Sequence, residues 1–209
     1  MPKTKTTKAY ATIRKQLKTG DLVFFSGKGG ISAGIKWATT SRWSHVAMVL
    51  NLTQYDFVTL WESTTLSTIR DLDTHTMMKG VQLIPLSDRV QTYDGEIAVR
   101  QLKGVTLAEP EIAELMALRR DLRGRSYETS EAELIKAAYD GPFGHNEEDL
   151  SSLFCSELVA ESYQRMGLRP SGKKDKQSNE YVPADFSQDE YDELGLLRGS
   201  LGPEILLRR

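Results

Sequence analysis

The single cysteine of the chain, Cys155, lies where a short polar run passes into an amphipathic helix expected over residues 153–166. In the first turn of a helix, a thiol faces unpaired backbone N–H groups and the positive end of the macrodipole, and both stabilise the thiolate. The thiolate is the nucleophilic form, so Cys155 could attack an acyl carbon. The alternative is a small buried hydrophobic residue, because free cysteine is among the most buried residue types.

A base and an acid stand on two neighbouring strand-like segments. His45 is near the start of the apolar segment 44–50, and alternation places it on one face with Ala47 and Val49. Glu62 is near the end of the next segment, 56–63, where its carboxylate would face His45 and orient the imidazole. A carboxylate after so apolar a run is costly to bury without a partner. Together with Cys155, these residues form a Cys-His-acid set.

The elements that must position this set are strands first and helices second. Short apolar runs bounded by turn residues predict a five-stranded antiparallel sheet, and a 3.6-residue period predicts the helices. We therefore expect one α+β domain over residues 20–209, preceded by a basic helix over residues 1–19 in which Tyr10, Ile13 and Leu17 share a face. The strands are expected at 22–25, 44–50, 56–63, 81–86 and 96–102, and the helices at 111–123, 134–138 and 153–166, with a polar loop over 140–150.

Four ordered motifs resemble the circularly permuted branch of the NlpC-type papain-like cysteine hydrolases, in particular the YiiX/YebB-like group. They are Gly-Asp-Leu-Val-Phe at 20–24, Trp-Ser-His-Val-Ala-Met-Val at 43–49, Leu-Trp-Glu-Ser at 60–63 and Phe-Cys-Ser-Glu-Leu-Val at 154–159. Gly-Arg-Ser-Tyr at 124–127 also resembles a stretch of that group. In the permuted branch the histidine strand precedes the cysteine helix, as it does here. The resemblance implies a papain-like fold whose helical layer carries the nucleophile Cys155, with His45 as general base and Glu62 as the third, orienting residue.

The expected function is a cysteine hydrolase that cleaves an amide bond, in a peptide or an acyl amide, through a thioester acyl-enzyme. The backbone N–H of Cys155 is the expected oxyanion-hole donor. One alternative is a lipid acyltransferase or thioesterase with the same Cys-His site, and another is a non-catalytic binding module that kept the fold. The substrate is thus a peptide or an acylated small molecule or lipid, and the resemblance does not select among these.

Three further residues are candidates for binding the substrate. Asp21 follows a turn glycine beside the expected cleft, and the alternative, which the sequence favours, is a structural Asx turn. Trp43 and Tyr127 could line an apolar groove, although aromatic residues next to a sheet also belong to cores.

Composition restricts the remaining classes of function. With 209 residues, 39% hydrophobic and 27% charged, the chain resembles an average globular protein, and its net charge of −2 argues against nucleic-acid binding. One cysteine excludes an internal disulfide and a cysteine-based zinc cage, and His75 and His145 lack ligand spacing, so we expect neither a metal nor another cofactor.

No apolar stretch is long enough to span a bilayer, and the N-terminus lacks the apolar run of a secretory signal, which predicts a cytoplasmic protein. The lysines of the N-terminal segment would allow peripheral contact with an anionic membrane, or they form a solvated helix face. The oligomeric state has no signature in the sequence.

Overall fold

The computed structural model describes residues 6–27, 41–126, 147–171, 175–188 and 194–208. Within them, one large sheet is packed between helices, in agreement with the predicted α+β class. The helix expected over 134–138 and the first part of the loop expected over 140–150 lie outside the described residues.

Five antiparallel strands form the middle and one edge of the sheet. Their register places Phe25 opposite His45 and Met48 opposite Trp61. The observed strands match the five predicted ones to within one or two residues at each end, because each is a short apolar run closed by turn residues. In the order in which they lie side by side, they are β6 (Gly95–Arg100), β2 (Leu22–Gly27), β3 (His45–Leu52), β4 (Phe57–Thr64) and β5 (Gly80–Pro85).

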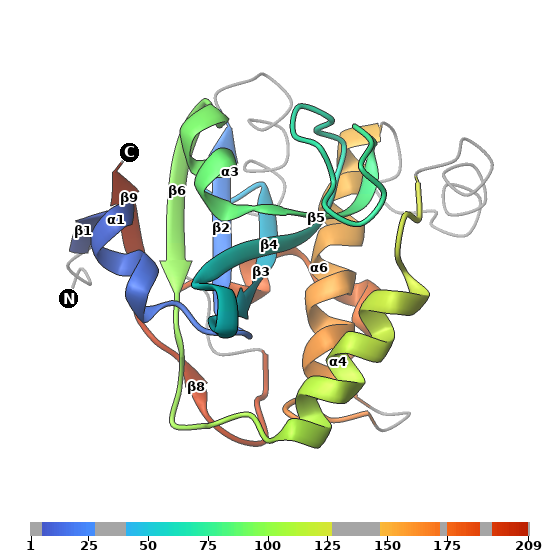
Figure 1. The fold of residues 1–209 in the computed structure, drawn as a ribbon. Helices are drawn as coiled ribbons and strands as arrows, with labels where there is room; N and C mark the ends of the chain where they lie inside the picture. Colours follow the sequence, from blue (N-terminus) through green and yellow to red (C-terminus); the bar gives the residue numbers. More distant parts are fainter. Residues whose placement is uncertain (1–5, 28–40, 127–146, 172–174, 189–193, 209) are drawn as a thin grey trace.

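Two strands that the sequence analysis did not predict extend the sheet beyond β6. β9 (Ile205–Arg208) pairs antiparallel with β6, and β1 (Thr6–Ala9) pairs parallel with β9, so segments from the two ends of the sequence lie side by side (Figure 1). The expectation of a helix for this whole N-terminal segment is wrong for β1. The helical part is α1 (Tyr10–Ile13), followed by a short 3-10 turn.

The two faces of the sheet carry separate hydrophobic cores, because successive side chains along a strand point to opposite sides. Phe24 and Met48 belong to the core that also contains Cys155 and the apolar side chains of α4 and α6. Val23 and Ala47 belong to the other core, with Ile13 and the apolar side chains of α3. Figure 1 shows α4 and α6 packed together on one side of the sheet. These helices are α3 (Leu86–Thr92), α4 (Glu109–Asp121) and α6 (Glu147–Arg165).

The remaining elements are short and connect the larger ones. A small second sheet is formed by β7 and β8, and 3-10 turns occur at four places in the described chain. Their bounds are β7 (Leu102–Lys103), β8 (Ser200–Leu201), η1 (Arg14–Gln16), η2 (Thr53–Tyr55), η3 (Ser178–Glu180) and η4 (Pro183–Phe186).

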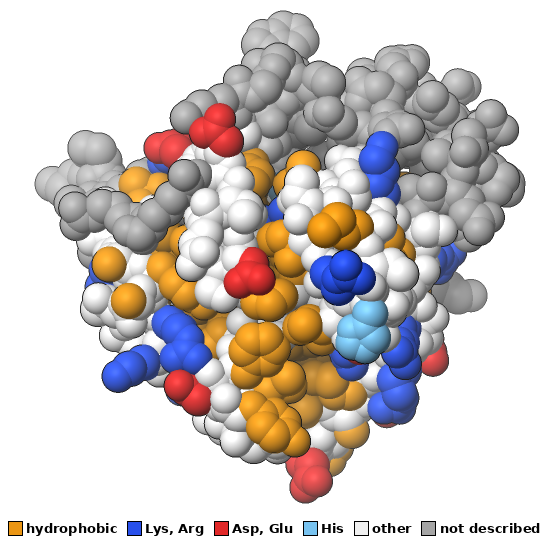
Figure 2. All heavy atoms as spheres, turned by 45° about the horizontal axis from the view of Figure 1, so that its top comes forward, with side chains coloured by type: hydrophobic (Ala, Val, Ile, Leu, Met, Phe, Trp, Pro, Cys, Tyr) orange, Lys and Arg blue, Asp and Glu red, His pale blue; other side chains and the backbone are white. Residues whose placement is uncertain are grey.

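One face of the molecule shows apolar side chains gathered in its middle, with basic and acidic side chains interspersed around them (Figure 2). The large apolar side chains with the greatest exposure in the described chain are Tyr55, Leu66, Met77 and Leu197. Because charges of both signs are mixed on this face, it carries no extended positive or negative electrostatic potential.

Candidate active site

His45 and Glu62 form a direct hydrogen-bonded pair. His45 is the first residue of β3, and the antiparallel register with β4 puts both side chains on the same face of the sheet. The distance between His45 Nε2 and Glu62 Oε2 is 2.9 Å. Glu62 has no exposed surface, and the His45 side chain is only 12% exposed. The contact predicted from the hairpin register is therefore present.

Cys155 reaches this pair from the other side of the sheet. It lies on α6, is fully buried, and belongs to the core on the α6 face, whereas Ala47 of the histidine strand belongs to the opposite core. Because His45 is the first residue of β3, its ring lies at the end of the strand, where it interacts with the Cys155 side chain by charge and by hydrogen bonding. The Cys155 sulfur also lies 3.9 Å from Ser156 Oγ.

The helix that carries Cys155 begins earlier than predicted. α6 starts at Glu147, so Cys155 lies about two turns inside the helix rather than in its first turn. The macrodipole acts mainly within the first turn, so it contributes little at this depth. The Cys155 N–H, the predicted oxyanion donor, lies inside the helix, where such groups bond to the carbonyl four residues back.

Arg89 completes the site, and the sequence analysis did not identify it. The guanidinium group donates to Glu62 Oε1 from Nε at 3.1 Å and from Nη2 at 2.5 Å, so it uses the oxygen that His45 does not. Arg89 is 1% exposed. The one signal in the sequence is the cost of burying Glu62, for which His45 is the only partner that the sequence analysis names.

In this site, neighbouring charges shift the pKa values of His45 and Glu62 in the direction opposite to the effect of burial. Burial lowers the pKa of His45, but Cys155 and then Glu62 outweigh it and raise that pKa to about 9. Burial likewise works to raise the pKa of Glu62, but Arg89 and His45 overcome it and hold that pKa below its usual value. Glu62 is therefore a carboxylate and His45 an imidazolium at neutral pH.

The aromatic ring of Phe25 packs against the His45 imidazole, and the ring of Tyr93 packs against Phe25. The Phe25 ring lies 5.4 Å from the His45 ring and 4.9 Å from the Tyr93 ring, measured between centroids. Burial is the main cause that raises the pKa of Tyr93 to about 12, against the hydrogen bond with Ser44. Tyr93 thus remains a neutral phenol beside the charged pair.

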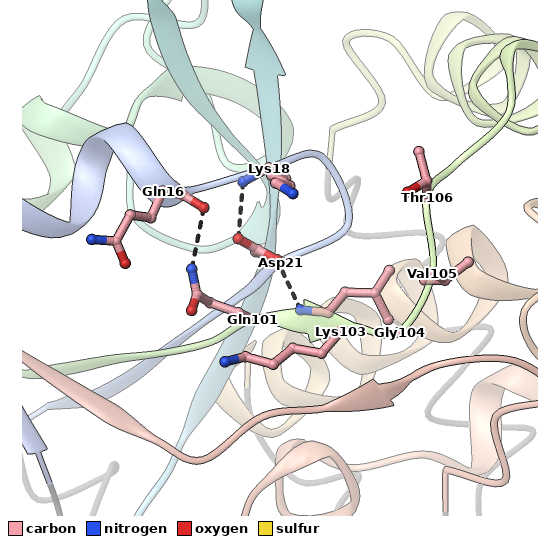
Figure 3. A pocket seen from close by; sticks show the side chains of 9 residues that line it. Gln16, Lys18, Asp21, Gln101, Lys103, Gly104, Val105 and Thr106 are labelled. Atoms are coloured by element: carbon pink, nitrogen blue, oxygen red, sulfur yellow. Dashed lines mark hydrogen bonds between the residues drawn. The ribbon is translucent and has the colours of Figure 1, made fainter.

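Asp21, predicted as a substrate-binding residue, is not brought next to the His45–Glu62 pair. It precedes β2 by one residue and lies four residues before Phe25, the partner of His45, or about 13 Å along the strand. Its carboxylate accepts hydrogen bonds from Lys18 N at 2.9 Å, drawn in Figure 3, and from Leu102 N at 2.8 Å. These bonds give Asp21 a structural role, but they do not form the Asx turn that was the alternative explanation, because the donors lie three residues before Asp21 and at Leu102. Asp21 also lines a separate cavity of about 620 Å³.

The two aromatic candidates do not define a groove. Trp43 is fully buried, its Nε1 donates to Glu204 Oε1 at 2.8 Å, and its ring packs 5.7 Å from that of Phe24. Trp43 is therefore a core residue in this structure, which does not bring it to a groove as a substrate contact. Tyr127 lies outside the described residues.

A cavity of about 340 Å³ lies beside α6, the helix that carries Cys155. Phe154 and Leu158 of α6 line it, one on each side of Cys155 in the sequence, and Val81, Leu118 and Leu122 add apolar surface. Its polar lining consists of Ser63, Arg125, Ser126, Glu157 and Glu161. Burial raises the pKa of Glu157, Arg125 opposes the shift, and Glu161 adds to it. The cavity therefore combines an apolar wall with acidic and basic groups.

In papain-like thiol hydrolases a helix carries the cysteine and a sheet carries the histidine, and this protein is of that class, with the histidine strand ahead of the cysteine helix. Residues 16–189 match the family model of the permuted papain-like amidases of the YaeF/YiiX type, family C92. The chain therefore belongs to this family and is a cysteine-type amidase or hydrolase at that level of description.

Among solved structures, the chain is similar to the metalloprotein YiiX from Escherichia coli O157:H7. The identity is 22%, the match covers 72% of this chain and 67% of that one, and the TM-score is 0.48. A search of curated proteins found no significant match. Within the described residues of this chain, no three His, Cys, Asp or Glu side chains are grouped so that they could hold a metal ion. No helix in the described part of the chain has the length and apolar character needed to cross a membrane.

Proposed function

We propose that this protein hydrolyses an amide bond, in a peptide or an acyl amide, through a thioester acyl-enzyme. Cys155 is the nucleophile, His45 the general acid and base, and Glu62 the residue that orients the imidazole. The observation that carries the proposal is the position of His45, held by Nε2 at 2.9 Å from Glu62 while its ring interacts with Cys155. The proposed compartment is the cytoplasm, where a lone thiol stays reduced.

The reaction proceeds in two halves. The Cys155 sulfur attacks the carbonyl carbon, a C–S bond forms, and the carbonyl electron pair moves to oxygen. The C–N bond then breaks, the amine takes the proton of the His45 imidazolium, and a thioester remains. In the second half, neutral His45 takes a proton from water, the water oxygen attacks the thioester, and the C–S bond breaks. The acid leaves, and the thiolate and the imidazolium are restored.

The protonation states support this sequence. A His45 pKa of about 9 supplies an imidazolium at neutral pH, as the departing amine requires. The lowered pKa of Glu62 keeps a carboxylate against the imidazolium.

The cavity beside α6 supports an amide substrate that has both apolar and charged parts. Leu118, Leu122 and Phe154 offer surface to an aliphatic or aromatic group, and Arg125 and Glu157 offer opposite charges to a peptide. A peptide or an acylated amino compound presents this combination of groups.

Two alternatives have specific observations in their favour. The apolar wall of the same cavity suits a lipid acyl chain, and a thioester on Cys155 would serve a thioesterase or acyltransferase equally. A non-catalytic binding module is favoured by the complete burial of Cys155, which has no exposed surface in this structure.

Thiol labelling tests the Cys-His pair before the substrate is identified. The rate of alkylation of Cys155 by iodoacetamide is measured across pH for wild type, His45→Ala and the matched control His75→Ala, since His75 is exposed. We expect fast labelling near neutral pH in wild type and His75→Ala, and markedly slower labelling in His45→Ala. Equal rates at the level of a free thiol in all three proteins would overturn the proposal.

Acyl-enzyme trapping then separates the three functions. Wild type and Cys155→Ala are incubated with acylated amide, ester and thioester compounds, and the protein mass is followed. A transient acyl adduct with release of amine supports the amidase, whereas reaction confined to lipid esters and thioesters supports the first alternative. Activated labelling without any turnover supports the binding module.

A further inference from the structure

Arg89 contacts Glu62 of the proposed catalytic pair from a buried position. Burying its charge costs hydration free energy, so we ask what the residue contributes. The chain buries the guanidinium of α3 together with the Glu62 carboxylate, at 1% and 0% exposure. A buried ion pair often adds no more stability than an apolar pair of similar size, because both charges lose their hydration. Stability alone is therefore a weak reason for burying an arginine in the last turn of a seven-residue helix.

The geometry of the contact indicates what Arg89 does. Its Nε and Nη2 both donate to Glu62 Oε1, while Nη1 lies 3.4 Å from Thr68 Oγ1 and ties the group to a neighbouring loop. With Oε1 held by two donors, rotation of the carboxylate is restricted, and Oε2 is left to face His45 Nε2 at 2.9 Å. An imidazole held through Nε2 has Nδ1 free for the thiol.

We infer that Arg89 is a positioning residue that holds Glu62 ionised and aims its second oxygen at His45. The inference deepens the proposed function and rests on it. Arg89 acts through Glu62 and has no role in contacting the substrate. The charged and titratable groups that face Glu62 are His45 from β3, Arg89 from α3 and Tyr93 just after α3, and Cys155 of α6 faces His45.

The sign of the effect follows from these charges. Without Arg89, burial works on Glu62 with less opposition, so the carboxylate takes up a proton more readily. His45 then loses an anionic neighbour, and its own pKa falls. If Arg89 acted only by direct repulsion of the imidazolium, its removal would raise the pKa of His45 instead. The two explanations therefore predict opposite directions.

The test is an NMR titration of His45, which does not require Cys155 to be accessible. The chain has three histidines, so His45→Gln identifies the resonance. We expect Arg89→Met to lower the pKa of His45 by about one unit or more, a tenfold loss of proton affinity. Arg89→Lys keeps the positive charge but loses the paired Nε and Nη2 donors, so we expect a smaller fall in the pKa of His45. In a Glu62→Gln background, Arg89→Met produces no further fall, because the residue through which it acts carries no charge.

Arg169→Met is the matched control for a general loss of packing. Arg169 is 2% exposed and donates to Ala160 O and Lys176 O, so its loss destabilises a different part of the fold. We expect a lower melting temperature and an unchanged His45 titration. Where Arg89→Met does not fold, Arg89→Gln replaces it, with the same expected direction.

An unchanged or higher His45 pKa in Arg89→Met would overturn the inference, as would an equal fall in the Glu62→Gln background. These results are separable from failure of the proposed function. Labelling of wild-type Cys155 at the rate of a free thiol defeats the proposed function, whereas activated labelling with an Arg89-independent titration defeats only the role of Arg89.

Discussion

Two buried carboxylates of the same sheet behave in opposite ways. Glu62 and Asp21 are 0% and 1% exposed, and burial is the largest influence on the pKa of each. Yet the pKa of Glu62 lies below its usual value, whereas that of Asp21 is raised from 3.8 to about 6. Glu62 meets a guanidinium and an imidazole, while Asp21 meets two backbone N–H groups and has lysines only nearby.

The difference shows that the kind of partner decides what a buried acid can do. Neutral N–H donors satisfy the oxygens of Asp21 but do not repay the loss of hydration, so this residue joins β2 to the chain around Leu102 as a hydrogen-bond acceptor. Two cationic partners keep Glu62 charged, so it can act in turn on the charge of one of them, His45. In each case the partner, rather than the degree of burial, indicates the role.

Neutralising each acid should separate the two roles most clearly. Glu62→Gln is expected to lower kcat/KM by about 10²- to 10⁴-fold, because the imidazole loses its orienting charge. Asp21→Asn should retain the wild-type kcat/KM per folded molecule. Steady-state kinetics on the substrate found by acyl trapping measures both. Similar losses in the two variants would remove the distinction.

Removing the acceptor at Asp21 should instead affect stability. Asp21→Ala leaves the N–H groups of Lys18 and Leu102 without their partner, which is expected to cost about 1–3 kcal/mol in the free energy of unfolding. Urea denaturation measures this loss. Asp71→Ala is the matched variant, since Asp71 is also 1% exposed and bound by backbone N–H groups, and its loss should be similar. An activity loss in Asp21→Ala without a stability loss would contradict the structural role.

The pH dependence of stability should carry opposite signs at the two acids. The folded-state pKa of Asp21 is above its unfolded value, so its contribution to stability is complete below about pH 4 and is lost as the pH rises through about 6. The Glu62 contribution runs the other way, being present above the unfolded value and lost as the pH falls. The free energy of unfolding of wild type minus that of Asp21→Asn should therefore decrease over this range. A constant difference would show that Asp21 titrates normally.

The smallest expected effect concerns the lysines around Asp21. Lys18 and Lys103 border the cavity with Asp21 (Figure 3), and both lower its pKa. Both side chains are exposed, so the double variant Lys18→Gln, Lys103→Gln should raise the pKa of Asp21 by only about a few tenths of a unit. Carboxyl NMR measures the shift, and high salt should reproduce it in wild type. A large shift would indicate a stronger charge contact than the hydrogen-bonding pattern suggests.

The sequence predicts those features that leave a local pattern. The five central strands follow from short apolar runs, and the His45–Glu62 contact follows from the register of one hairpin. The meeting of His45 with Cys155 has no such pattern, because the two belong to different faces of the sheet and to distant segments. The family resemblance supplied that pairing.

The features that were missed depend on tertiary contacts. Arg89 has the sequence context of an ordinary surface arginine in a short helix, and only the fold buries it against Glu62. The sequence around Trp43 does not indicate whether its side chain is buried. Its burial depends on tertiary contacts such as the hydrogen bond from Trp43 Nε1 to Glu204, which is far along the chain. The early start of α6 was missed because the acidic run before Cys155 is equally typical of a loop.

The pairing of β1 with β9 has a consequence for the timing of folding. Thr6 lies opposite Ile205, so β1 has no strand to join until about two hundred more residues have been synthesised, or about 10–40 s at common translation rates. During that interval the central strands and the helix bearing Cys155 emerge in full, while β1 exposes unpaired backbone groups. β6 lacks its outer neighbour for the same period. This edge of the sheet can therefore be completed only after β9 has been synthesised, whereas the five central strands can pair before that.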